Sequence, residues 1–380
     1  MIKTKLRKML TAFAAASMLA FSLTGCGGSS SSSSAETQAP AASSAETAAS
    51  QSSAAGSSSA SSEIGAPETK KFTLYGVNDL QISAAMMVAE KEGYFKDEGL
   101  DVDTVYMNNV PEIAAIMANG EAKIACANNY STPSWVTNGA PTTIISPTVN
   151  MGGTQCLLLR KGIEIKSPKD LEGLTMGMVS GSTQYVCFIN MCQATGIDPS
   201  KIKVSTLQFA DQLSALSSGD IDIMAVPEPW VTKAQEQEGA TLLCSGTKSY
   251  IPGYEGDVTW CNLYSTLNAN TDWAKENPNT VEHVLRAFAK ATDFINDNRD
   301  EAVKICAEHI GMSEDDTKKI MSENVYKFGA DDTYVETTKE LEKFMEENNI
   351  LPSGSSVPFE KYHDFTYLKA AVPEAYTAAE

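Results

Sequence analysis

The sequence predicts an α/β protein whose globular part folds as two lobes of similar topology. Strand-like and helix-like segments alternate along this part, which is typical of parallel sheets covered by helices. The same order of segments occurs twice, and aligning Gly120 with Gly219 gives an offset of 99 residues. In addition, a globular part of about 310 residues is large for a single hydrophobic core and natural for two.

The chain begins with the features of an exported lipoprotein. Four cations lie within residues 3–8, and an apolar stretch over residues 9–23 follows them. At about 15 residues this stretch is too short to cross a bilayer as a helix. Residues 23–26, Leu-Thr-Gly-Cys, then resemble a lipobox. We therefore expect a signal peptide over residues 1–25, lipid attachment at Cys26, and anchoring to the outer face of the cell membrane.

A segment of low complexity follows the lipidated cysteine. Residues 26–68 consist mainly of Ser, Ala, Thr, Gln and Gly, with no aromatic residue and a single Ile. Such a composition cannot bury enough apolar surface to offset the entropy lost on ordering. A flexible coil of about 40 residues spans roughly 35 Å, so we expect a tether.

Each pass through the globular part has three strands and two helices. In the first pass we expect strands over residues 72–77, 100–106 and 123–127 and helices over 83–92 and 111–118. In the second we expect strands over 175–179, 202–207 and 221–226 and helices over 183–194 and 211–216. The second helix of each pass stops at a glycine that precedes an acid and a strand, which is why the two passes align.

Two segments should carry the chain between the lobes. We expect an outward crossing over residues 154–160 and a return over 259–266, which gives lobe 1 as 69–156 and 264–380 and lobe 2 as 157–263. Helices should follow the return over 278–296, 299–310, 314–326 and 333–348. The first of these has apolar residues at helical spacing. We expect these helices to pack mainly on lobe 1.

Composition excludes several classes of function. The net charge of −19 becomes −23 once the four cations of residues 1–25 are removed, which argues against binding nucleic acid or anionic membranes through a basic surface. Seven cysteines remain besides Cys26, without any Cys-x-x-Cys pair, and the three histidines lie near the end of the chain, far from any cluster of cysteines. We therefore expect no metal site and no cofactor. We expect the cysteines to be buried thiols, and one disulfide among them remains an alternative.

Three segments resemble a known family. Residues 89–103 contain Gly-Tyr-Phe and Glu-Gly-Leu, residues 168–183 end in Ser-Gly-Ser-Thr, and residues 218–230 end in Pro-Glu-Pro-Trp. In this order they resemble solute-binding proteins of the nitrate/sulfonate/taurine type, whose superfamily includes binders of thiamine-pyrimidine precursors. The resemblance covers residues 70–330. It implies a two-lobed, type II periplasmic-binding-protein-like fold with a ligand cleft between the lobes, and an ABC permease and its ATPase as partners of a monomer.

Ligands of open α/β sheets lie beyond the carboxyl ends of the strands, against helix amino ends. Two such places belong to lobe 1. After the opening strand, Asn78 and Gln81 can hydrogen-bond a small polar molecule, although Asn78 could instead cap a helix. After the third strand, Asn128, Asn129 and Tyr130 offer amides and a ring face, with one Asn expected to serve the turn.

The third place is the Ser-Gly-Ser-Thr turn of lobe 2. Here Ser180, Ser182 and Thr183 stand between a strand and a helix, so backbone N–H groups and hydroxyls converge. That arrangement suits a sulfonate, carboxylate or phosphate without any Arg. Plain N-capping of the helix is the alternative, and the two roles can coexist.

The fourth place follows a buried strand of lobe 2. Glu228 between two prolines could pair with an ammonium or an amidine-like ring edge, and Trp230 could close over the body of the ligand. The alternative is a surface carboxylate next to a core tryptophan. Trp260, in the return crossing, is a further candidate for the cleft.

These observations favour capture of a small polar organic solute such as taurine. An aminopyrimidine is the close alternative, because Glu228 could grip its ring nitrogen and amine while Trp230 stacks on it. Catalysis is disfavoured: eukaryotic pyrimidine synthases of similar fold use a cysteine-rich run and a catalytic histidine, and no histidine precedes His283. We therefore assign no catalytic residue. A third class of function, besides solute import and catalysis, is a sensor that uses the same fold without transport.

Overall fold

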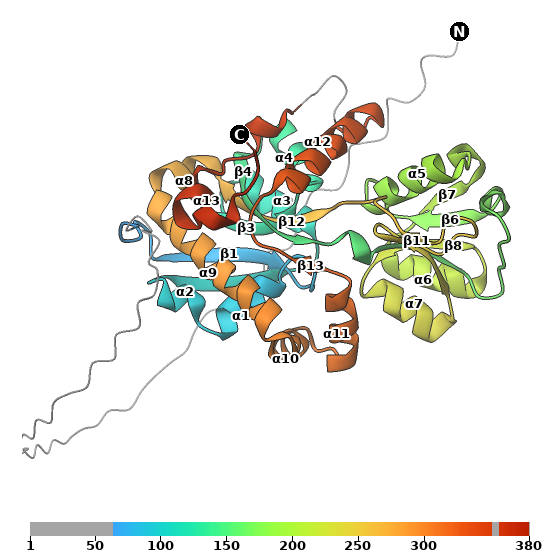
Figure 1. The fold of residues 1–380 in the computed structure, drawn as a ribbon, viewed down its shortest axis with the longest axis horizontal. Helices are drawn as coiled ribbons and strands as arrows, with labels where there is room; N and C mark the ends of the chain where they lie inside the picture. The colour runs from blue at the N-terminus through green and yellow to red at the C-terminus, as the bar shows by residue number, and fades with distance from the viewer. Residues whose placement is uncertain (1–63, 352–356, 380) are drawn as a thin grey trace, which may run out of the picture. The chain divides into compact units, whose positions relative to one another are not determined.

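The computed structural model describes residues 64–351 and 357–379 (Figure 1). The chain divides into two units, Met1–Ser59 and Ala60–Glu380, and the described residues all belong to the second. The expected signal peptide, the lipidated Cys26 and the expected tether up to residue 63 lie outside the described residues. Among the described helices, none has the length and apolar character that crossing a membrane requires.

The first sheet combines parallel and antiparallel strands. Its core is β1, which pairs in parallel with both β2 and β3, while β12 runs antiparallel to β3 and β4. The strand order is β13-β4-β12-β3-β1-β2, with bounds β1 Lys71–Val77, β2 Asp101–Met107, β3 Ile124–Asn128, β4 Thr142–Asn150, β12 Tyr264–Asn270 and β13 Val325–Tyr326.

The second sheet repeats the same core. Strand β6 pairs in parallel with β7 and β8, and β5 runs antiparallel between β8 and β9. The order is β11-β10-β9-β5-β8-β6-β7, with bounds β5 Gln155–Leu159, β6 Thr175–Met178, β7 Lys203–Thr206, β8 Ile223–Pro227, β9 Thr241–Ser245, β10 Lys248–Ser249 and β11 Gly256–Asp257. The repeat found in the sequence is therefore a repeat of topology.

The chain passes between the sheets at residues 151–154 and 258–263. The outward crossing expected at residues 154–160 is wrong, because β5 occupies this stretch and is an interior strand of the second sheet. We call residues 64–150 and 264–379, as far as described, the first-sheet lobe, and residues 155–257 the second-sheet lobe. Gln155 and Cys156 thus join the second lobe; the rest of the expected division stays a prediction.

Helices flank both sheets. Those outside the second-sheet lobe are α1 Ala84–Lys91, α2 Tyr94–Asp97, α3 Val110–Ala118, α4 Ser131–Thr137, α8 Thr271–Glu276, α9 Pro278–Asp297, α10 Arg299–Ile310, α11 Glu314–Ser322, α12 Asp332–Glu347 and α13 Thr366–Ala371. The second-sheet lobe contains α5 Gln184–Thr195, α6 Phe209–Ser218 and α7 Trp230–Glu238. Short 3-10 helices occur at Gly152–Thr154, Pro168–Leu171, Pro199–Lys201, Phe359–Lys361 and Pro373–Ala375.

The central strands of the second sheet are buried on both faces. Figure 1 shows α5 on one face and α6 and α7 on the other. Along β5, Cys156 and Leu158 pack with α6 and α7, whereas Leu157 and Leu159 belong to the main core. This alternation is the period of two that a strand imposes. A strand covered on both faces reads as a continuous apolar run, as residues 156–159 do.

The helices after the return crossing pack mainly on the first-sheet lobe, as expected. Phe288 of α9 meets Phe95 of α2 edge to face, with ring centroids 5.9 Å apart. The Lys290 ammonium on α9 contacts the buried Glu98 carboxylate at 2.6 Å. One expected boundary is wrong: the helix expected to reach residue 326 ends at Ser322, and Val325–Tyr326 forms β13 at the sheet edge.

The first described residues are fastened to the start of α9. The Glu68 carboxylate accepts hydrogen bonds from the backbone N–H groups of Asn279 (3.2 Å) and Thr280 (2.9 Å), which are among the unpaired donors of a helix start. The Thr69 hydroxyl donates to Asn277 at 2.6 Å. Burial opposes ionisation of Glu68, but these hydrogen bonds outweigh it and lower its pKa. We call residues 65–69 the N-terminal clamp.

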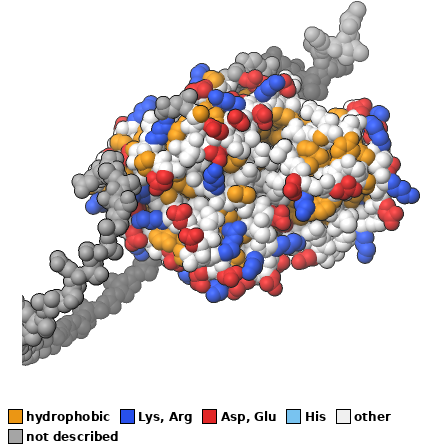
Figure 2. All heavy atoms as spheres, viewed as in Figure 1, with side chains coloured by type: hydrophobic (Ala, Val, Ile, Leu, Met, Phe, Trp, Pro, Cys, Tyr) orange, Lys and Arg blue, Asp and Glu red, His pale blue; other side chains and the backbone are white. Residues whose placement is uncertain are grey.

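The surface carries both signs of charge. Figure 2 shows acidic and basic side chains interspersed on the face drawn, while hydrophobic side chains gather over the second-sheet lobe. One exposed apolar residue of that lobe is Val204 on β7, an edge strand of the sheet, whose side chain is 50% exposed. An edge strand with an exposed apolar side chain is a potential contact surface.

Candidate functional site

Two of the expected ligand edges touch each other. Gln81 lies in the turn between β1 and α1, and its Nε2 donates to the backbone oxygen of Glu228, at the end of β8, at 3.1 Å. Both residues are buried, so the hydrogen bond joins the strand ends of the two lobes out of water. Asn78, in the same turn as Gln81, is exposed, and its backbone N–H binds the carbonyl of Met107.

The segment after β3 is held by its own amides. The Asn128 side chain accepts from the N–H groups of Tyr130 (3.2 Å) and Ser131 (2.8 Å), which is the turn role expected for one of the two Asn residues. Asn129 is fully buried, and its Nδ2 donates to Thr338 Oγ1 of α12 at 3.1 Å. Both amides therefore fix the backbone that presents Tyr130.

The turn between β6 and α5 is tied to the start of β5. The Thr183 hydroxyl donates to Gln155 Oε1 at 2.8 Å, and Gln184 Nε2 donates to the same oxygen at 2.7 Å. The Ser182 N–H is spent on the carbonyl of Val179 at 3.2 Å. Ser180 is exposed. Some of the donors of this turn, which we expected to bind an anion, are thus already bonded within the protein. Its three hydroxyls also differ in their exposure and in their hydrogen bonds.

Glu228 binds the start of its own helix. Its two carboxylate oxygens accept from the backbone N–H of Thr232 (3.0 Å) and from the Thr232 hydroxyl (3.1 Å). Burial raises the pKa of Glu228, and the two bonds from Thr232 oppose that rise. A buried carboxylate at the amino end of α7 is favoured by the unpaired helix N–H groups there. The side chain is therefore engaged in capping, with one face of each oxygen left for another donor.

The two candidate tryptophans lie in different surroundings. Trp230 begins α7, is half-buried, and carries the Lys233 ammonium 4.4 Å from its ring centroid. Trp260, in the return crossing, is buried and lines a groove of about 240 Å³ between α5 and α12. In this groove Asn190 Nδ2 donates to the Trp260 carbonyl at 2.8 Å. Of the expected site residues, Trp260 is the one that lines this groove.

Three buried polar atoms near the strand ends have no hydrogen-bond partner among the described residues. They are the Tyr130 hydroxyl, the Ser182 hydroxyl and Gln184 Oε1. Tyr130 belongs to the first-sheet lobe and the other two to the second. Tyr130 also interacts electrostatically with Tyr185, the neighbour of Gln184 on α5. An unpaired buried polar group is unfavourable by about 1–3 kcal/mol, so each of the three atoms would gain from a group that supplies a hydrogen bond.

Asp79 is a carboxylate of the same turn that the sequence reasoning did not consider. It lies between Asn78 and Gln81, and its Oδ1 accepts from the Ile82 N–H at 2.7 Å. Burial raises the pKa of Asp79 from 3.8 to about 7, against the effect of the backbone N–H groups of Ile82 and Gln81. A perturbed carboxyl at a strand end is a signal of a functional site. In the sequence, Asp79 is only an acidic residue within a turn, and this pattern is too common to single it out as a candidate.

The described residues contain no reactive thiol and no cluster of metal-ligating side chains. All seven described cysteines are free and buried, and burial raises the pKa of Cys126 and Cys261, which keeps these thiols protonated and unreactive. In the same part of the chain, no group of three or more His, Cys, Asp or Glu side chains could hold a metal ion.

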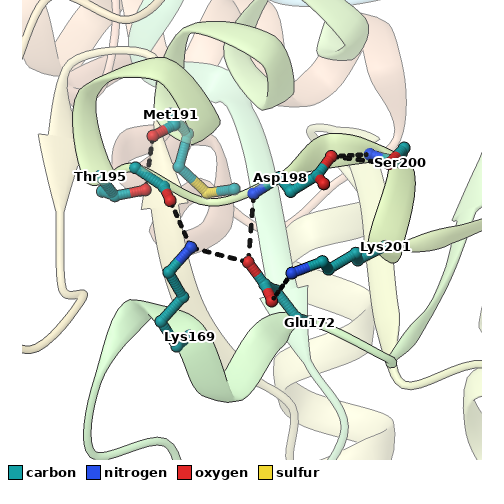
Figure 3. A network of polar contacts seen from close by, with 8 residues as sticks. Lys169, Glu172, Met191, Thr195, Asp198, Ser200 and Lys201 are labelled. Atoms are coloured by element: carbon teal, nitrogen blue, oxygen red, sulfur yellow. Dashed lines mark hydrogen bonds and ion pairs between the residues drawn. The ribbon is translucent and has the colours of Figure 1, made fainter.

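A dense ionic network of the second-sheet lobe lies at the far end of α5. Figure 3 shows Glu172 between Lys169 and Lys201, with carboxylate–ammonium distances of 2.8 and 2.9 Å. Lys169 also donates to the carbonyl of Gly196 at 2.6 Å, just past the end of the helix. The hydrogen bonds from both lysines lower the pKa of Glu172 to about 2. This network caps the carboxyl end of α5, whereas the unpaired atoms of Ser182 and Gln184 lie at its amino end.

A protein-family model described as "NMT1/THI5 like" matches residues 82–302, more than half of the chain. The chain belongs to the NMT1/THI5-like family.

Curated relatives of this family member have solute-binding names. A putative aliphatic sulfonates-binding protein of Bacillus subtilis is 23% identical over 65% of this chain and 71% of its own length. A formylaminopyrimidine-binding protein of Halalkalibacterium halodurans is 23% identical over 58% of this chain and 64% of its own length. A putative aliphatic sulfonates-binding protein of Escherichia coli is 23% identical over 42% of this chain and 46% of its length, so the match spans about half of that relative.

Solved structures establish the fold of this NMT1/THI5-like protein. The periplasmic aliphatic sulphonate binding protein of Escherichia coli aligns with a TM-score of 0.65 and 15% identity, over 78% of this chain and 92% of that one. A putative periplasmic sulfonate-binding protein of Methylobacillus flagellatus gives 0.66 and 15%, over 82% and 99%. The nitrate-binding protein of a Synechocystis species gives 0.62 and 15%, over 82% and 90%. The expected two-lobed periplasmic-binding-protein fold is confirmed.

The family resemblance is thus confirmed, while the expected site residues stay predictions. The structure connects Gln81 with Glu228 and Thr183 with Gln155, and it leaves the hydroxyls of Tyr130 and Ser182 unpaired. It leaves Asn78 and Ser180 exposed. Besides Asp79, sequence reasoning did not consider Gln155 or Gln184 as candidates. Gln155 was assigned to a connector, and Gln184 resembled an ordinary first helical residue.

Proposed function

We propose that this protein is the extracytoplasmic solute-binding component of an ABC importer. It captures a small polar organic solute between its lobes and delivers it to a membrane permease that works with an ATPase. The family, the fold and the names of the relatives support this proposal. The observation that carries it is the set of unpaired buried atoms of Tyr130, Ser182 and Gln184, which come from both lobes. A solute bonded to them while the lobes close would remove the unfavourable burial.

The preferred cargo is a sulfonate that also carries an amine, as taurine does. Sulfonate-binding names among the relatives support the acidic end. The free hydroxyls of Tyr130 and Ser182 can donate to sulfonate oxygens. The raised pKa of Glu228, due to burial, reflects a carboxylate that gains from a cationic partner such as an ammonium.

An aminopyrimidine is the second candidate. The formylaminopyrimidine-binding relative supports it, and so do the carboxyl groups of the half-buried Asp79 and the buried Glu228, whose segments are joined by the hydrogen bond from Gln81. Groups of this kind bind ring nitrogens and exocyclic amines through charge-assisted hydrogen bonds. A sulfonate without an amine would gain nothing from them.

The remaining parts of the proposal concern location and assembly. The protein is exported, lipid-anchored through Cys26 and monomeric, and it carries no catalytic residue. If it were a sensor without a transport role, its gene would stand apart from genes for a permease and an ATPase. A neighbouring permease and ATPase gene pair is the observation that separates these two functions.

The test is a thermal-shift screen of the chain from Ile64 onward. Sulfonates, amino acids, pyrimidines and vitamin precursors are added one at a time, and the melting temperature is measured. A ligand present at a hundred times its Kd should stabilise the fold by about 2.7 kcal/mol. One class of solute should raise the melting temperature in a concentration-dependent way. If no solute does so, solute capture is wrong.

A further inference from the structure

We infer that Gln184 selects solutes that carry a hydrogen-bond donor, such as an amine or ring N–H, at the point where they meet the amino end of α5. This inference deepens the proposed function and rests on it. Gln184 is 1% exposed and is the first residue of α5, directly after the Ser-Gly-Ser-Thr turn. The selection follows from the direction in which its side-chain amide is held.

The orientation of Gln184 is set by Gln155. Gln155 Nε2 donates to Thr154 Oγ1 at 3.2 Å and to the Met151 carbonyl at 3.4 Å, and the Thr154 hydroxyl itself donates to that carbonyl at 2.8 Å. If the Gln155 amide were reversed, its oxygen would face the Met151 carbonyl, and two acceptors would meet. The oxygen of Gln155 must therefore point toward α5.

That oxygen accepts two hydrogen bonds from the start of α5. The Thr183 hydroxyl donates to it at 2.8 Å, and Gln184 Nε2 donates at 2.7 Å. Gln184 cannot turn its own oxygen toward Gln155 without placing two acceptors together. Its Nε2 thus stays bound to Gln155, and its Oε1 is held on the other side. An amide oxygen can accept hydrogen bonds but never donate them.

Gln184 Oε1 has no partner in the described part of the chain, and it is buried. Two further unpaired atoms are the hydroxyl of Ser182, two residues earlier, and that of Tyr130 in the other lobe. Hydroxyls can donate or accept, so they tolerate either kind of ligand group. Gln184 does not, and it is therefore the member of the set that discriminates.

A site that presents a buried acceptor rejects a ligand that cannot donate to it, because the acceptor then stays unpaired. A sulfonate with only acceptor oxygens leaves Gln184 unsatisfied. The same sulfonate with an amine satisfies it, as does an aminopyrimidine. Both cargo classes above contain solutes that meet this requirement. The solute must carry a donor at this point, and the rest of its structure is not constrained.

The test uses two ligand pairs that differ mainly in one donor group: taurine with ethanesulfonate, and 4-aminopyrimidine with pyrimidine. Calorimetric titration of the wild-type chain should show that the donor-bearing member of one pair binds at least tenfold more tightly than its partner. Equal affinities within the pair that binds would overturn the inference and leave solute capture intact. If none of the four probes binds, capture of both proposed cargo classes is wrong.

A variant then assigns the selection to Gln184. Gln184→Met keeps the length of the side chain but removes its acceptor, so the preference for the donor-bearing ligand should fall to less than threefold. Gln237→Met, at an exposed glutamine on α7, is the matched control and should keep the full preference. Melting curves show whether Gln184→Met folds. If it does not fold, the comparison of ligand pairs on the wild-type chain still tests the inference. A preference retained by folded Gln184→Met would overturn the assignment.

Discussion

Glu228 combines two roles that can be separated by experiment. Its carboxylate holds Thr232 at the start of α7, and we propose that it also attracts a cationic group of the solute. Glu228→Gln keeps an acceptor oxygen for Thr232 but removes the charge. Hydrogen bonds to charged groups contribute about 1.5–3 kcal/mol. We therefore expect taurine affinity, measured by calorimetry, to fall at least tenfold while the melting temperature changes little.

The control for this variant is Glu236→Gln, at an exposed residue of the same helix, and it should bind as the wild type does. Unchanged affinity in Glu228→Gln would leave Glu228 with the capping role alone. Loss of both affinity and stability would mean that capping and binding cannot be separated at this residue.

Asp79 should make stability depend on pH in the direction opposite to most carboxylates. Burial raises the pKa of Asp79 from 3.8 to about 7, so between these values the folded protein holds a proton that the unfolded chain has released. The free energy of unfolding then decreases as the pH rises through this window and levels off above about pH 7. Asp79→Asn keeps an oxygen for the Ile82 N–H and should remove this contribution.

The measurement is chemical denaturation of wild type and Asp79→Asn at several values between pH 4 and pH 8. The difference between the two proteins should grow in favour of the variant as the pH increases. Asp97→Asn, at an exposed residue, should follow the wild type. A constant difference between wild type and Asp79→Asn across the window would show that Asp79 does not titrate there.

At the scale of elements, the N-terminal clamp is a helix cap supplied from a distant part of the chain. Glu68 satisfies N–H groups at the start of α9 from 211 and 212 positions away. Loss of a capping side chain typically destabilises a protein by about 1 kcal/mol. We expect Glu68→Ala to lower the free energy of unfolding by about this amount and to speed hydrogen exchange at residues 65–69 and the first turn of α9.

Glu276→Ala is the control for the clamp, since Glu276 is exposed at the end of α8, just before α9. It should leave exchange at residues 65–69 unchanged. Exchange in Glu68→Ala that matches the wild type would mean that Thr69 and the packing of the segment hold it without the carboxylate.

Elements with an amphipathic or repeated pattern could be predicted from the sequence. Helix α9 was expected over residues 278–296 and spans Pro278–Asp297, because its apolar stripe packs against the first-sheet lobe. The place of β5 inside the second sheet and the existence of β13 could not. A strand buried on both faces has no alternating pattern, and β13 is a two-residue strand defined by its pairing with β4.

At the scale of the whole molecule, the repeat in the sequence predicted two lobes, and the fold confirms it. The candidate site residues could not be predicted reliably from the sequence, for a physical reason. Residues such as Asn128 and Thr183 have the chemistry of ligand contacts, yet they are spent on turns and on Gln155. A polar atom stays unpaired only if no other strand, helix or lobe supplies it with a hydrogen-bond partner. Gln184 acquires its proposed role through Gln155, 29 residues away, and no local pattern contains that information.

The N-terminal clamp has a mechanical consequence for the two lobes. A force transmitted along the chain from residues before Ile64 enters the folded part at Glu68 and passes into α9, and from there into the first sheet. The second-sheet lobe is connected by two short crossings and by contacts such as Lys319 with Gln235 and Phe344 with Tyr185. Such a force therefore acts on the first-sheet lobe first and reaches the second-sheet lobe only through these crossings and contacts.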